Sequence, residues 1–377
     1  MGRVIFSFVL MTAIALYAEA VKSIDFENEP EGVYTVEQLK ASWNNPSWND
    51  GVSERRCHIV NDPTGVREKV LRISYPEGSV GPEQGGAQWK MNFAQGYDTL
   101  YVSYYIMLPE DFDRVQGGKL PGLAGGTAPT GGAVSDGTDG FSARIMWRNR
   151  STADGTQSAI CQYMYYMEST NTWGEDFFWA HPNPTWSSTR RYLVHGQWHN
   201  LKTRIIMNTP GARNGRVTSW LDGELALDST IMLRAEGADF GVDLFYFSTF
   251  FGGNDASWAS SKEEFIYFDN FVFSTQDIPT GPVYCRRNSA SKIFKTAAIE
   301  VSAQKSFSSV LFKIQTDICG PGVLKLFSID GTQVESIIIK PSGVLNFSVG
   351  ERYSSGRYLG VFRGDKFHES VQFSVLR

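Results

Sequence analysis

Residues 141–148 read FSARIMWR, and their pattern decides the fold. Every second side chain is apolar, while the alternate positions carry Ser142, Arg144 and Arg148 together with Met146. Successive side chains of a β-strand point to opposite faces, so this pattern predicts a strand with one face on a hydrophobic core. The predicted core face consists of Phe141, Ala143, Ile145 and Trp147.

Segments of similar character recur along the chain, separated by Gly, Pro, Asn and Asp, while long amphipathic helical patterns are scarce. This combination is typical of an all-β sandwich or barrel. Such folds run to roughly 200–250 residues as one domain, so we expect one large all-β domain over residues 21–280. Its further predicted strands are residues 161–167, 201–208, 244–253 and 264–274, with a hairpin that turns at Asp222-Gly223.

The beginning of the chain predicts export. Residues 1–20 combine Arg3, a mostly apolar stretch and the small-x-small sequence Ala18-Glu19-Ala20. This order is typical of a secretory signal peptide, and the apolar stretch is too short to span a bilayer. Because no other segment approaches a membrane-spanning length, we expect a secreted, extracellular protein.

The end of the chain predicts a second, smaller unit. Residues 281–292 lie in a stretch rich in Pro, Gly, Ser and Thr, which predicts a linker. Residues 293–377 contain two strand pairs, with turns near Asp330-Gly331 and Gly364-Asp365, and so predict a small C-terminal β-sandwich. This unit resembles the sorting or attachment modules of secreted enzymes from some Gram-negative bacteria, which would hold the protein at the cell surface. A plain accessory β-domain is the alternative.

Cysteines, histidines and net charge limit the partners. Four cysteines permit two disulfides in an exported chain, with three pairings open. His195 and His199 are expected to hydrogen-bond locally, and we expect no metal site. The net charge of −5 excludes a generally cationic polyanion binder, so we expect no nucleic-acid partner, and positive charge for an anionic substrate must be local. The cysteines are Cys57, Cys161, Cys285 and Cys319.

The decapeptide GGKLPGLAGG, residues 117–126, contains a single charge, Lys119. Its glycines suggest a sharp turn that leaves room beside the lysine. Four further side chains join Lys119 as candidates for chemistry. They are Ser142 and Arg144 on one predicted strand face, and Tyr163 and Tyr165 on another.

This set of side chains suits β-elimination on a uronic acid polymer. In that reaction a base removes the C5 proton and an acid reaches the departing C4 oxygen. A cation must stabilise the enolate-like state that develops beside the sugar carboxylate. A glycoside hydrolase would instead need two suitably spaced carboxylates. Asp222, Glu224 and Asp228 share a face, but charged residues beside a hairpin are usually solvated.

Either tyrosine is able to fill both proton-transfer roles. A tyrosine has a reference pKa of about 10, and adjacent Arg and Lys charges favour the phenolate. In mannuronate and glucuronate the C5 proton and the C4 oxygen lie on one side of the ring, so one tyrosine could accept the first proton and return it. Taken singly, Tyr-x-Tyr on a strand is ordinary cross-strand packing. The rival function is a non-catalytic, lectin-like carbohydrate-binding jelly roll.

Several segments resemble the alginate lyases of polysaccharide lyase family 14 and the related glucuronan lyases of family 20. The resemblance covers about residues 85–275. It implies a concanavalin-like β-jelly-roll sandwich with an open cleft, and endolytic β-elimination on alginate or glucuronan, both β-1,4-linked polyuronates. The segments are, in order, GGKLPGLAGG, FSARIMWR, GQWHNLKTRIIMNTPGARNGRVTSWLDGEL, YFSTFFGGNDASWA and FDNF.

The resemblance also implies roles for individual residues. Lys119 matches the lysine required for activity in family 14, and Ser142 with Arg144 matches a Ser-x-Arg pair that handles the substrate. Tyr163 and Tyr165 match the family's Tyr-x-Tyr; a long preceding segment leaves Tyr166 as an alternative. Some family members bind a structural calcium, but no cofactor is assigned here, and a monomer is expected. Predicted substrate-binding residues are Gln88, which matches a family glutamine, Ser142, and the strand cations Arg148, Lys202 and Arg204.

Overall fold

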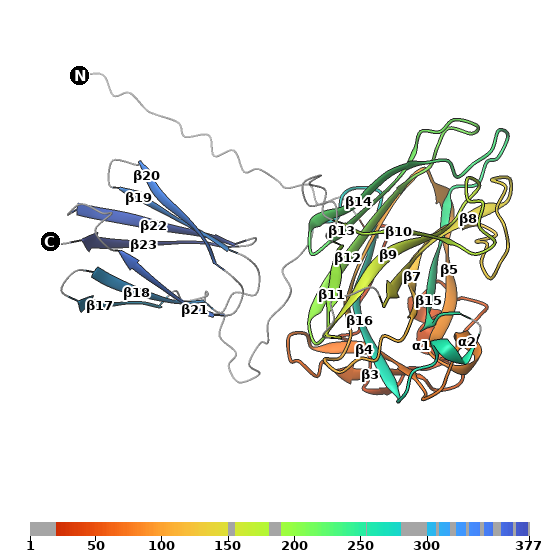
Figure 1. Cartoon of the computed structure of the whole chain (residues 1–377), viewed down its shortest axis with the longest axis horizontal. Helices are drawn as coiled ribbons and strands as arrows, with labels where there is room; N and C mark the ends of the chain where they lie inside the picture. Colours follow the sequence, from red (N-terminus) through yellow and green to blue (C-terminus); the bar gives the residue numbers. More distant parts are fainter. Residues whose placement is uncertain are drawn as a thin grey trace, which may run out of the picture.

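The computed structural model describes residues 20–149, 155–180, 190–253 and 255–279, together with strands between residues 300 and 375. Residues 21–279 form two antiparallel sheets with few helices, as expected for a jelly-roll sandwich (Figure 1). The predicted signal peptide and the linker 281–292 lie outside the described residues, apart from Ala20. No helix of the described part is long and apolar enough to cross a membrane.

The first sheet has the order β14-β13-β12-β6-β16-β4-β3-β2, with β1 paired to β16. Hairpin turns and bulges set its register; one turn lies at Asp222-Gly223, where both residues have positive φ, as the Asp-Gly pair predicted. Its strands are β1 (Lys22–Ile24), β2 (Gly32–Val33), β3 (Cys57–Asn61), β4 (Lys69–Tyr75), β6 (Thr99–Met107), β12 (Trp198–Ile206), β13 (Gly215–Leu221), β14 (Glu224–Ile231) and β16 (Glu264–Ser274).

The second sheet has the order β10-β9-β8-β7-β15-β5, with β11 paired to β9. The short helices α1 (Val36–Ser42), α2 (Gly81–Gln84) and η2 (Ala256–Trp258) lie outside both sheets. The strands of the second sheet are β5 (Ala87–Tyr97), β7 (Gly117–Gly126), β8 (Gly140–Arg148), β9 (Gln157–Tyr165), β10 (Glu175–Phe178), β11 (Tyr192–Val194) and β15 (Val242–Phe251).

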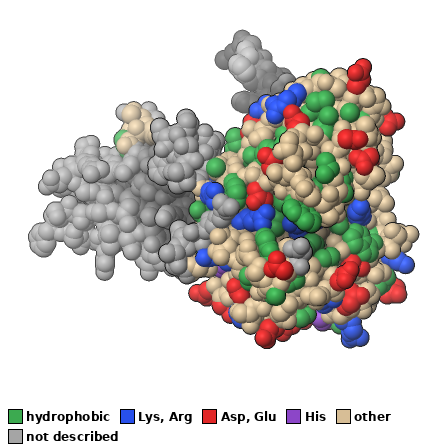
Figure 2. All heavy atoms as spheres, turned by 45° about the vertical axis from the view of Figure 1, so that its right-hand side comes forward, with side chains coloured by type: hydrophobic (Ala, Val, Ile, Leu, Met, Phe, Trp, Pro, Cys, Tyr) green, Lys and Arg blue, Asp and Glu red, His purple; other side chains and the backbone are tan. Residues whose placement is uncertain are grey.

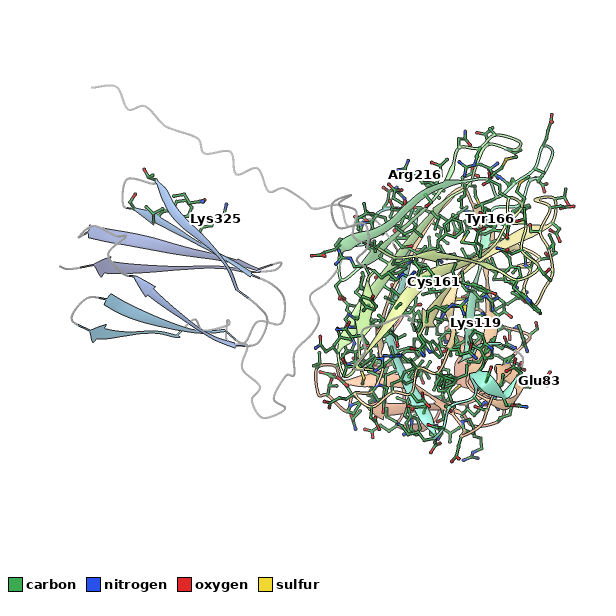
Figure 3. All side chains as sticks on the ribbon, viewed as in Figure 1. Glu83, Lys119, Cys161, Tyr166, Arg216 and Lys325 are labelled. Atoms are coloured by element: carbon green, nitrogen blue, oxygen red, sulfur yellow. The ribbon has the colours of Figure 1, made fainter. Side chains whose placement is uncertain are left out.

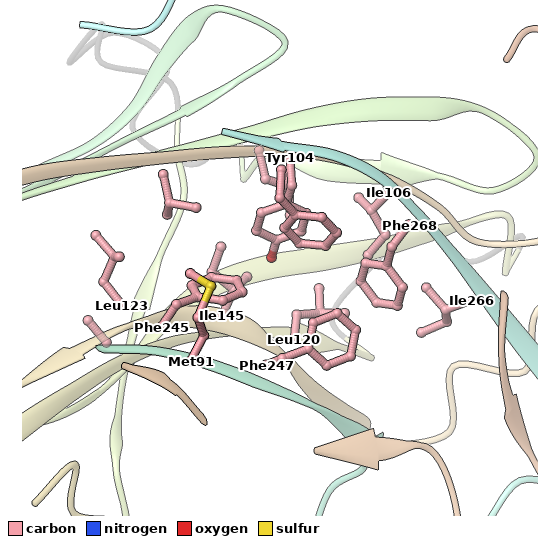
Figure 4. Packing of buried hydrophobic residues seen from close by; sticks show 14 of the residues in the cluster. Met91, Tyr104, Ile106, Leu120, Leu123, Ile145, Phe245, Phe247, Ile266 and Phe268 are labelled. Carbon is pink, nitrogen blue, oxygen red and sulfur yellow. The ribbon is translucent and has the colours of Figure 1, made fainter. Parts of the chain in front are cut away.

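Aromatic and aliphatic side chains from both sheets form one core between them (Figure 4). Phe245 of β15 packs 5.9 Å from Phe271 of β16, measured between ring centroids. The four apolar residues predicted for the inner face of β8 all belong to this core. Because that face is occupied by packing, the polar alternate positions of β8 lie on the outer face of the second sheet.

The decapeptide GGKLPGLAGG is a strand, β7, so the predicted turn was wrong. Its glycines meet a different requirement, because neighbouring groups approach the backbone too closely for a side chain. A Cβ atom on Gly118 would lie 2.0 Å from the Trp147 ring, and one on Gly122 would lie 2.1 Å from the Ala143 carbonyl oxygen. A bulge between Leu120 and Leu123 lets the strand keep its pairing with β8.

The C-terminal strands form two further antiparallel sheets. The pairings β19–β20 and β22–β23 confirm both predicted strand pairs; the predicted turn residues Asp330, Gly331 and Asp365 lie outside the described residues. One sheet has the order β17-β18-β21 and the other β20-β19-β22-β23. The strands are β17 (Glu300–Ser306), β18 (Ser309–Thr316), β19 (Gly322–Ser328), β20 (Gln333–Ile339), β21 (Gly343–Val349), β22 (Gly356–Gly364) and β23 (Phe367–Val375).

The expected framework of two disulfides is not formed. Cys57 of β3 and Cys161 of β9 are free and fully buried, so two of the four cysteines are unpaired thiols. Cys285 and Cys319 lie outside the described residues. Burial raises the pKa of both described thiols, which keeps them protonated and disfavours oxidation.

Candidate active site

Cross-strand register brings the predicted catalytic residues together on the outer face of the second sheet. Lys119 of β7 is opposite Met146 of β8. Two residues before Met146 on β8, Arg144 is opposite Tyr163 of β9. Two residues before Arg144, Ser142 is opposite Tyr165. Since directly opposed side chains on one face are neighbours, the three strands assemble a single cluster. We call it the Lys119 site, defined by Lys119, Arg144, Arg148, Tyr163 and Tyr165 (Figure 3 labels Lys119).

Lys119 is a buried amine without an acidic partner among the described residues. Its Nζ donates to Met146 Sδ at 2.8 Å and lies 3.7 Å from the centroid of the Tyr163 ring. Burial holds the pKa of Lys119 well below its usual range, and the positive charges of Arg144 and Arg148 lower it further. The amine therefore loses its proton far more readily than a solvent-exposed lysine.

Arg144 supplies a buried cation whose hydrogen-bonding capacity is largely unused. Its Nη1 donates to Ser248 Oγ at 3.2 Å, while its Nε has no partner among the described residues. The guanidinium carbon lies 5.1 Å from the Tyr246 ring centroid and 6.0 Å from those of Tyr163 and Tyr165. A buried, unpaired guanidinium is suited to an anionic ligand, because a carboxylate would satisfy its free donors.

Tyr163 and Tyr165 pack edge to face, with ring centroids 5.6 Å apart. The Gly174 N–H donates to Tyr163 Oη at 3.0 Å and fixes that hydroxyl. Burial raises the pKa of Tyr163, and the neighbouring Tyr165 raises it further, while Arg144 and Arg148 oppose the shift without cancelling it. The adjacent arginines thus act on the Tyr163 pKa in the expected direction, but desolvation by burial is larger and the net pKa shift is upward. The phenol stays protonated.

Tyr166, the alternative tyrosine, belongs to the hydrophobic core rather than to the Lys119 site. Its hydroxyl donates to Glu175 Oε2 at 3.0 Å and its ring packs on Phe177. A shift of one residue reverses the face of a side chain in a strand. The register therefore favours Tyr163 and Tyr165, as the Tyr-x-Tyr spacing predicted.

Arg148, a member of the Lys119 site, and Gln88 of β5 lie on the same outer face of the second sheet. Arg148 Nη2 forms a salt bridge of 2.7 Å with Asp176 Oδ1 of β10, so part of its charge is already balanced. On β5, Gln88 donates to Asp50 Oδ2 at 3.1 Å and accepts from Tyr246 Oη at 3.2 Å. Figure 2 shows Lys and Arg side chains beside hydrophobic ones on one face of the molecule.

The other predicted substrate-binding residues form hydrogen bonds with groups outside the Lys119 site. Ser142 is fully buried, and its hydroxyl donates to the Pro129 carbonyl at 2.7 Å. Lys202 and Arg204 belong to β12 of the first sheet, so the structure does not bring them to the Lys119 site. Lys202 Nζ binds Asp277 Oδ1 and the Ile278 carbonyl, and Arg204 donates to Tyr101 and Thr218 hydroxyls.

The carboxylates near the β13–β14 hairpin have structural partners. Asp222 accepts from His199 Nδ1 and from the Asn200 N–H, and Asp228 pairs with Arg216. His195 bonds Ser158 Oγ, so both histidines hydrogen-bond locally as expected. Among the described residues, no group of three or more His, Cys, Asp and Glu side chains is placed to hold a metal ion.

Three residues of the outer face were not predicted from the sequence. Tyr246 and Ser248 of β15 contact Arg144 and Gln88, and Asp176 pairs with Arg148. The signal for Tyr246 and Ser248 was present, because they are alternate polar positions in a mostly apolar strand. No sequence pattern indicated Asp176, because its salt bridge with Arg148 depends on the pairing of β10 with β9.

Comparisons with known proteins agree with this fold. The alginate lyase Aly36B is 24% identical, with 67% of this chain and 96% of that chain covered and a TM-score of 0.57. The alginate lyase of Aplysia kurodai is 21% identical, with 69% and 100% covered and a TM-score of 0.55. A curated relative, exolysin from Paramecium bursaria Chlorella virus 1, is 25% identical over 192 residues, which are 46% of this chain but only 29% of that relative.

The sequence model of one family, described as Polysaccharide lyase 14, matches residues 63–271. This range contains every member of the Lys119 site and spans more than half of the 377 residues. The chain therefore belongs to the polysaccharide lyase 14 family of enzymes.

Proposed function

We propose that this chain is a secreted lyase that cleaves a β-1,4-linked polyuronate by β-elimination and leaves 4,5-unsaturated uronate ends. The observation that carries the proposal is the contact between Lys119 and Tyr163 beside the buried guanidinium of Arg144. An amine with a lowered pKa, a phenol with a raised pKa and a free cation are the three groups that this elimination requires.

Arg144 is assigned to the uronate carboxylate. The C5 proton is barely acidic while the carboxylate keeps its full negative charge. A guanidinium that binds the carboxylate stabilises the extra charge as the C5–H bond breaks. The Nε of Arg144 is a buried donor without a hydrogen bond among the described residues, and a carboxylate bound beside it would satisfy it.

Lys119 is assigned as the base. Above its lowered pKa the amine is neutral and carries the lone pair that can accept the C5 proton. The electron pair of the C5–H bond then forms the C4–C5 double bond, and the C4–O bond breaks toward the leaving sugar.

Tyr163 is assigned as the acid. Its phenol is protonated across the neutral range because its pKa is raised, so it can donate a proton to the departing C4 oxygen. The lysine ammonium and the tyrosine phenolate formed in the step then restore their starting states by proton transfer through solvent. This assignment divides between two residues the roles that a single tyrosine was expected to fill.

Alginate is the favoured substrate. Aly36B variants with a lysine and either a methionine or a tyrosine replaced by alanine were solved with an alginate trisaccharide and tetrasaccharide, respectively. In this chain a lysine, a methionine and a tyrosine are in mutual proximity at the Lys119 site. Glucuronan stays a second candidate, because mannuronate and glucuronate differ only at C2 and the assigned groups act at C4 and C5.

The test follows the ultraviolet absorbance of the conjugated double bond during incubation with polymannuronate and with glucuronan. We expect the absorbance to rise with time on at least one polymer. The initial rate of this rise should be about 100-fold lower, or lower still, in Lys119→Ala and in Tyr163→Phe. Arg204→Gln, on the other sheet, serves as the control and keeps the wild-type rate. Binding without any rise in absorbance would instead support the lectin-like module.

Two further parts of the proposal concern location. The signal-peptide pattern of residues 1–20 supports export, and the C-terminal strands support a separate module that attaches the enzyme to a surface. Fractionation of cells that express the full chain tests both, since a chain without residues 293–377 should be released into the medium.

A further inference from the structure

Two large hydrophobic side chains of the lyase domain stand out by their exposure. Val134 is 64% exposed and Trp173 is 54% exposed, while most large apolar side chains of the described domain are buried. Tryptophan is highly buried on average in folded proteins. An exposed indole held in a defined place therefore suggests a surface that is covered when a ligand binds.

Both side chains lie in connections between strands of the second sheet, and the two connections touch. Val134 lies between β7 and β8, and Trp173 lies between β9 and β10. A Cβ atom on Gly132 would lie 3.4 Å from Cζ3 of the Trp173 ring, which is ordinary contact distance. The neighbouring connection therefore passes close to one edge of the indole, while Trp173 stays 54% exposed. We call residues 129–134 and 171–174 the Trp173 lip.

One segment of the Trp173 lip contacts the Lys119 site, and the other is hydrogen-bonded to Ser142, which is opposite Tyr165. Gly174 follows Trp173, and a Cβ on Gly174 would lie 2.7 Å from Cζ of Tyr163 and 2.8 Å from Cε2 of Tyr165. Consecutive Cα atoms are about 3.8 Å apart, so the backbone of Trp173 lies one residue from direct contact with both tyrosines. In the other segment, the Pro129 carbonyl accepts the hydrogen bond from Ser142.

We propose that Trp173 is a stacking platform for a sugar unit of the polyuronate, next to the unit that reacts at Tyr163. A pyranose ring has a face of C–H groups that packs on an indole, while its hydroxyls and carboxylate stay at the edge, in water. This proposal rests on the proposed polyuronate lyase function and assigns to the Trp173 lip the adjoining sugar, toward the Tyr165 side of the site.

The position of Trp173 explains why its role concerns binding rather than proton transfer. The indole contributes no group with a titration in the working range, and the hydrogen bond that fixes Tyr163 comes from the backbone of Gly174. Replacing the Trp173 side chain keeps that backbone donor. The effect is therefore expected in KM for substrates long enough to reach the platform.

The kinetic experiment compares Trp173→Ala and Trp173→Phe with the wild type on polymannuronate, by ultraviolet absorbance. We expect KM to rise about tenfold for the alanine variant, as for the loss of a well-packed aromatic contact. The phenylalanine variant should show a smaller rise, and kcat should stay within twofold for both. The matched control is Trp220→Phe, an indole on β13 of the first sheet that packs on Tyr101 and Lys202; its KM should be unchanged.

A binding experiment separates this proposal from the catalytic one. In the Lys119→Ala background, a mannuronate tetrasaccharide should change the tryptophan fluorescence, and the added Trp173→Phe change should remove most of that response and weaken binding. Unchanged KM and unchanged binding in the Trp173 variants would overturn the platform, as would a fall in kcat alone. Absence of turnover in the wild type would contradict the lyase function, while the fluorescence response would still decide the role of Trp173.

Discussion

Lys119 and Tyr163 show how one physical cause prepares two groups for opposite tasks. Burial disfavours a charged side chain, so it lowers the pKa of the lysine and raises that of the tyrosine. Both shifts favour the uncharged form of the side chain, as the proposed base and acid require, and Lys119 Nζ lies over the Tyr163 ring. Arg144 and Arg148 strengthen the effect on the lysine, because two cations nearby disfavour a third.

The pH dependence of turnover should reflect these two shifts. The rate should rise with pH as Lys119 loses its proton, at a pH well below the ordinary lysine range, because only the neutral amine accepts the C5 proton. It should fall only above the ordinary tyrosine range, because Tyr163 must stay protonated. Profiles of kcat/KM against pH, at constant ionic strength, measure both limbs.

Arg148→Gln provides the sharper test of this assignment. Removing this cation, and leaving Asp176 unbalanced, should raise the pKa of Lys119 and move the rising limb to higher pH by on the order of one unit. Arg204→Gln, on the first sheet, should leave the limb in place. A rising limb that did not move in Arg148→Gln would show that another group is the base.

At the scale of the strand, β7 marks the limit of what the sequence could predict. The inner face of β8 was predicted correctly, because period-two alternation indicates directly which side chains share one face of a strand. The glycines of β7 suggested a turn, because their cause is three-dimensional: Trp147 and Ala143 of the paired strand approach the backbone. Lys202 and Arg204 were placed with the Lys119 site for a related reason. The alternation of side chains shows which residues share a face of a strand, but it does not show to which of the two sheets the strand belongs.

Gly122→Ala tests this account of β7. The new methyl group would lie 2.1 Å from a backbone carbonyl oxygen, which cannot rotate away, so strands β7 and β8 must separate. We expect a loss of about 3 kcal/mol or more in the free energy of unfolding, and a fall in Tm of roughly 6–12 °C. Differential scanning calorimetry measures the change.

Gly131→Ala is the matched control for that substitution. Gly131, unlike Gly122, has a positive φ, but a Cβ there meets nothing within 4 Å, so the cost is limited to backbone strain of about 1 kcal/mol. Equal losses in the two variants would mean that contact with Ala143 is not the reason for glycine in β7.

At the scale of the whole chain, the boundary of the lyase domain follows from the contacts of its last described residues. No described strand beyond residue 300 pairs with a strand of the sandwich. Residues 277 and 278, by contrast, are part of it, because Lys202 Nζ binds Asp277 Oδ1 at 2.8 Å and the Ile278 carbonyl at 2.9 Å. Lys202 thus has a structural partner in the segment that leaves the domain.

Two truncated chains test this boundary against each other. A chain that ends at residue 280 should keep the wild-type kcat and KM on soluble polymannuronate, and its lyase domain should keep its Tm. A chain that ends at residue 274 loses both partners of the buried Lys202 ammonium, and should be less stable by about 1–3 kcal/mol. That loss corresponds to a fall in Tm of roughly 2–12 °C. If the two truncated chains had the same Tm, the segment after β16 would contribute nothing to the stability of the domain, and the boundary would belong at residue 274.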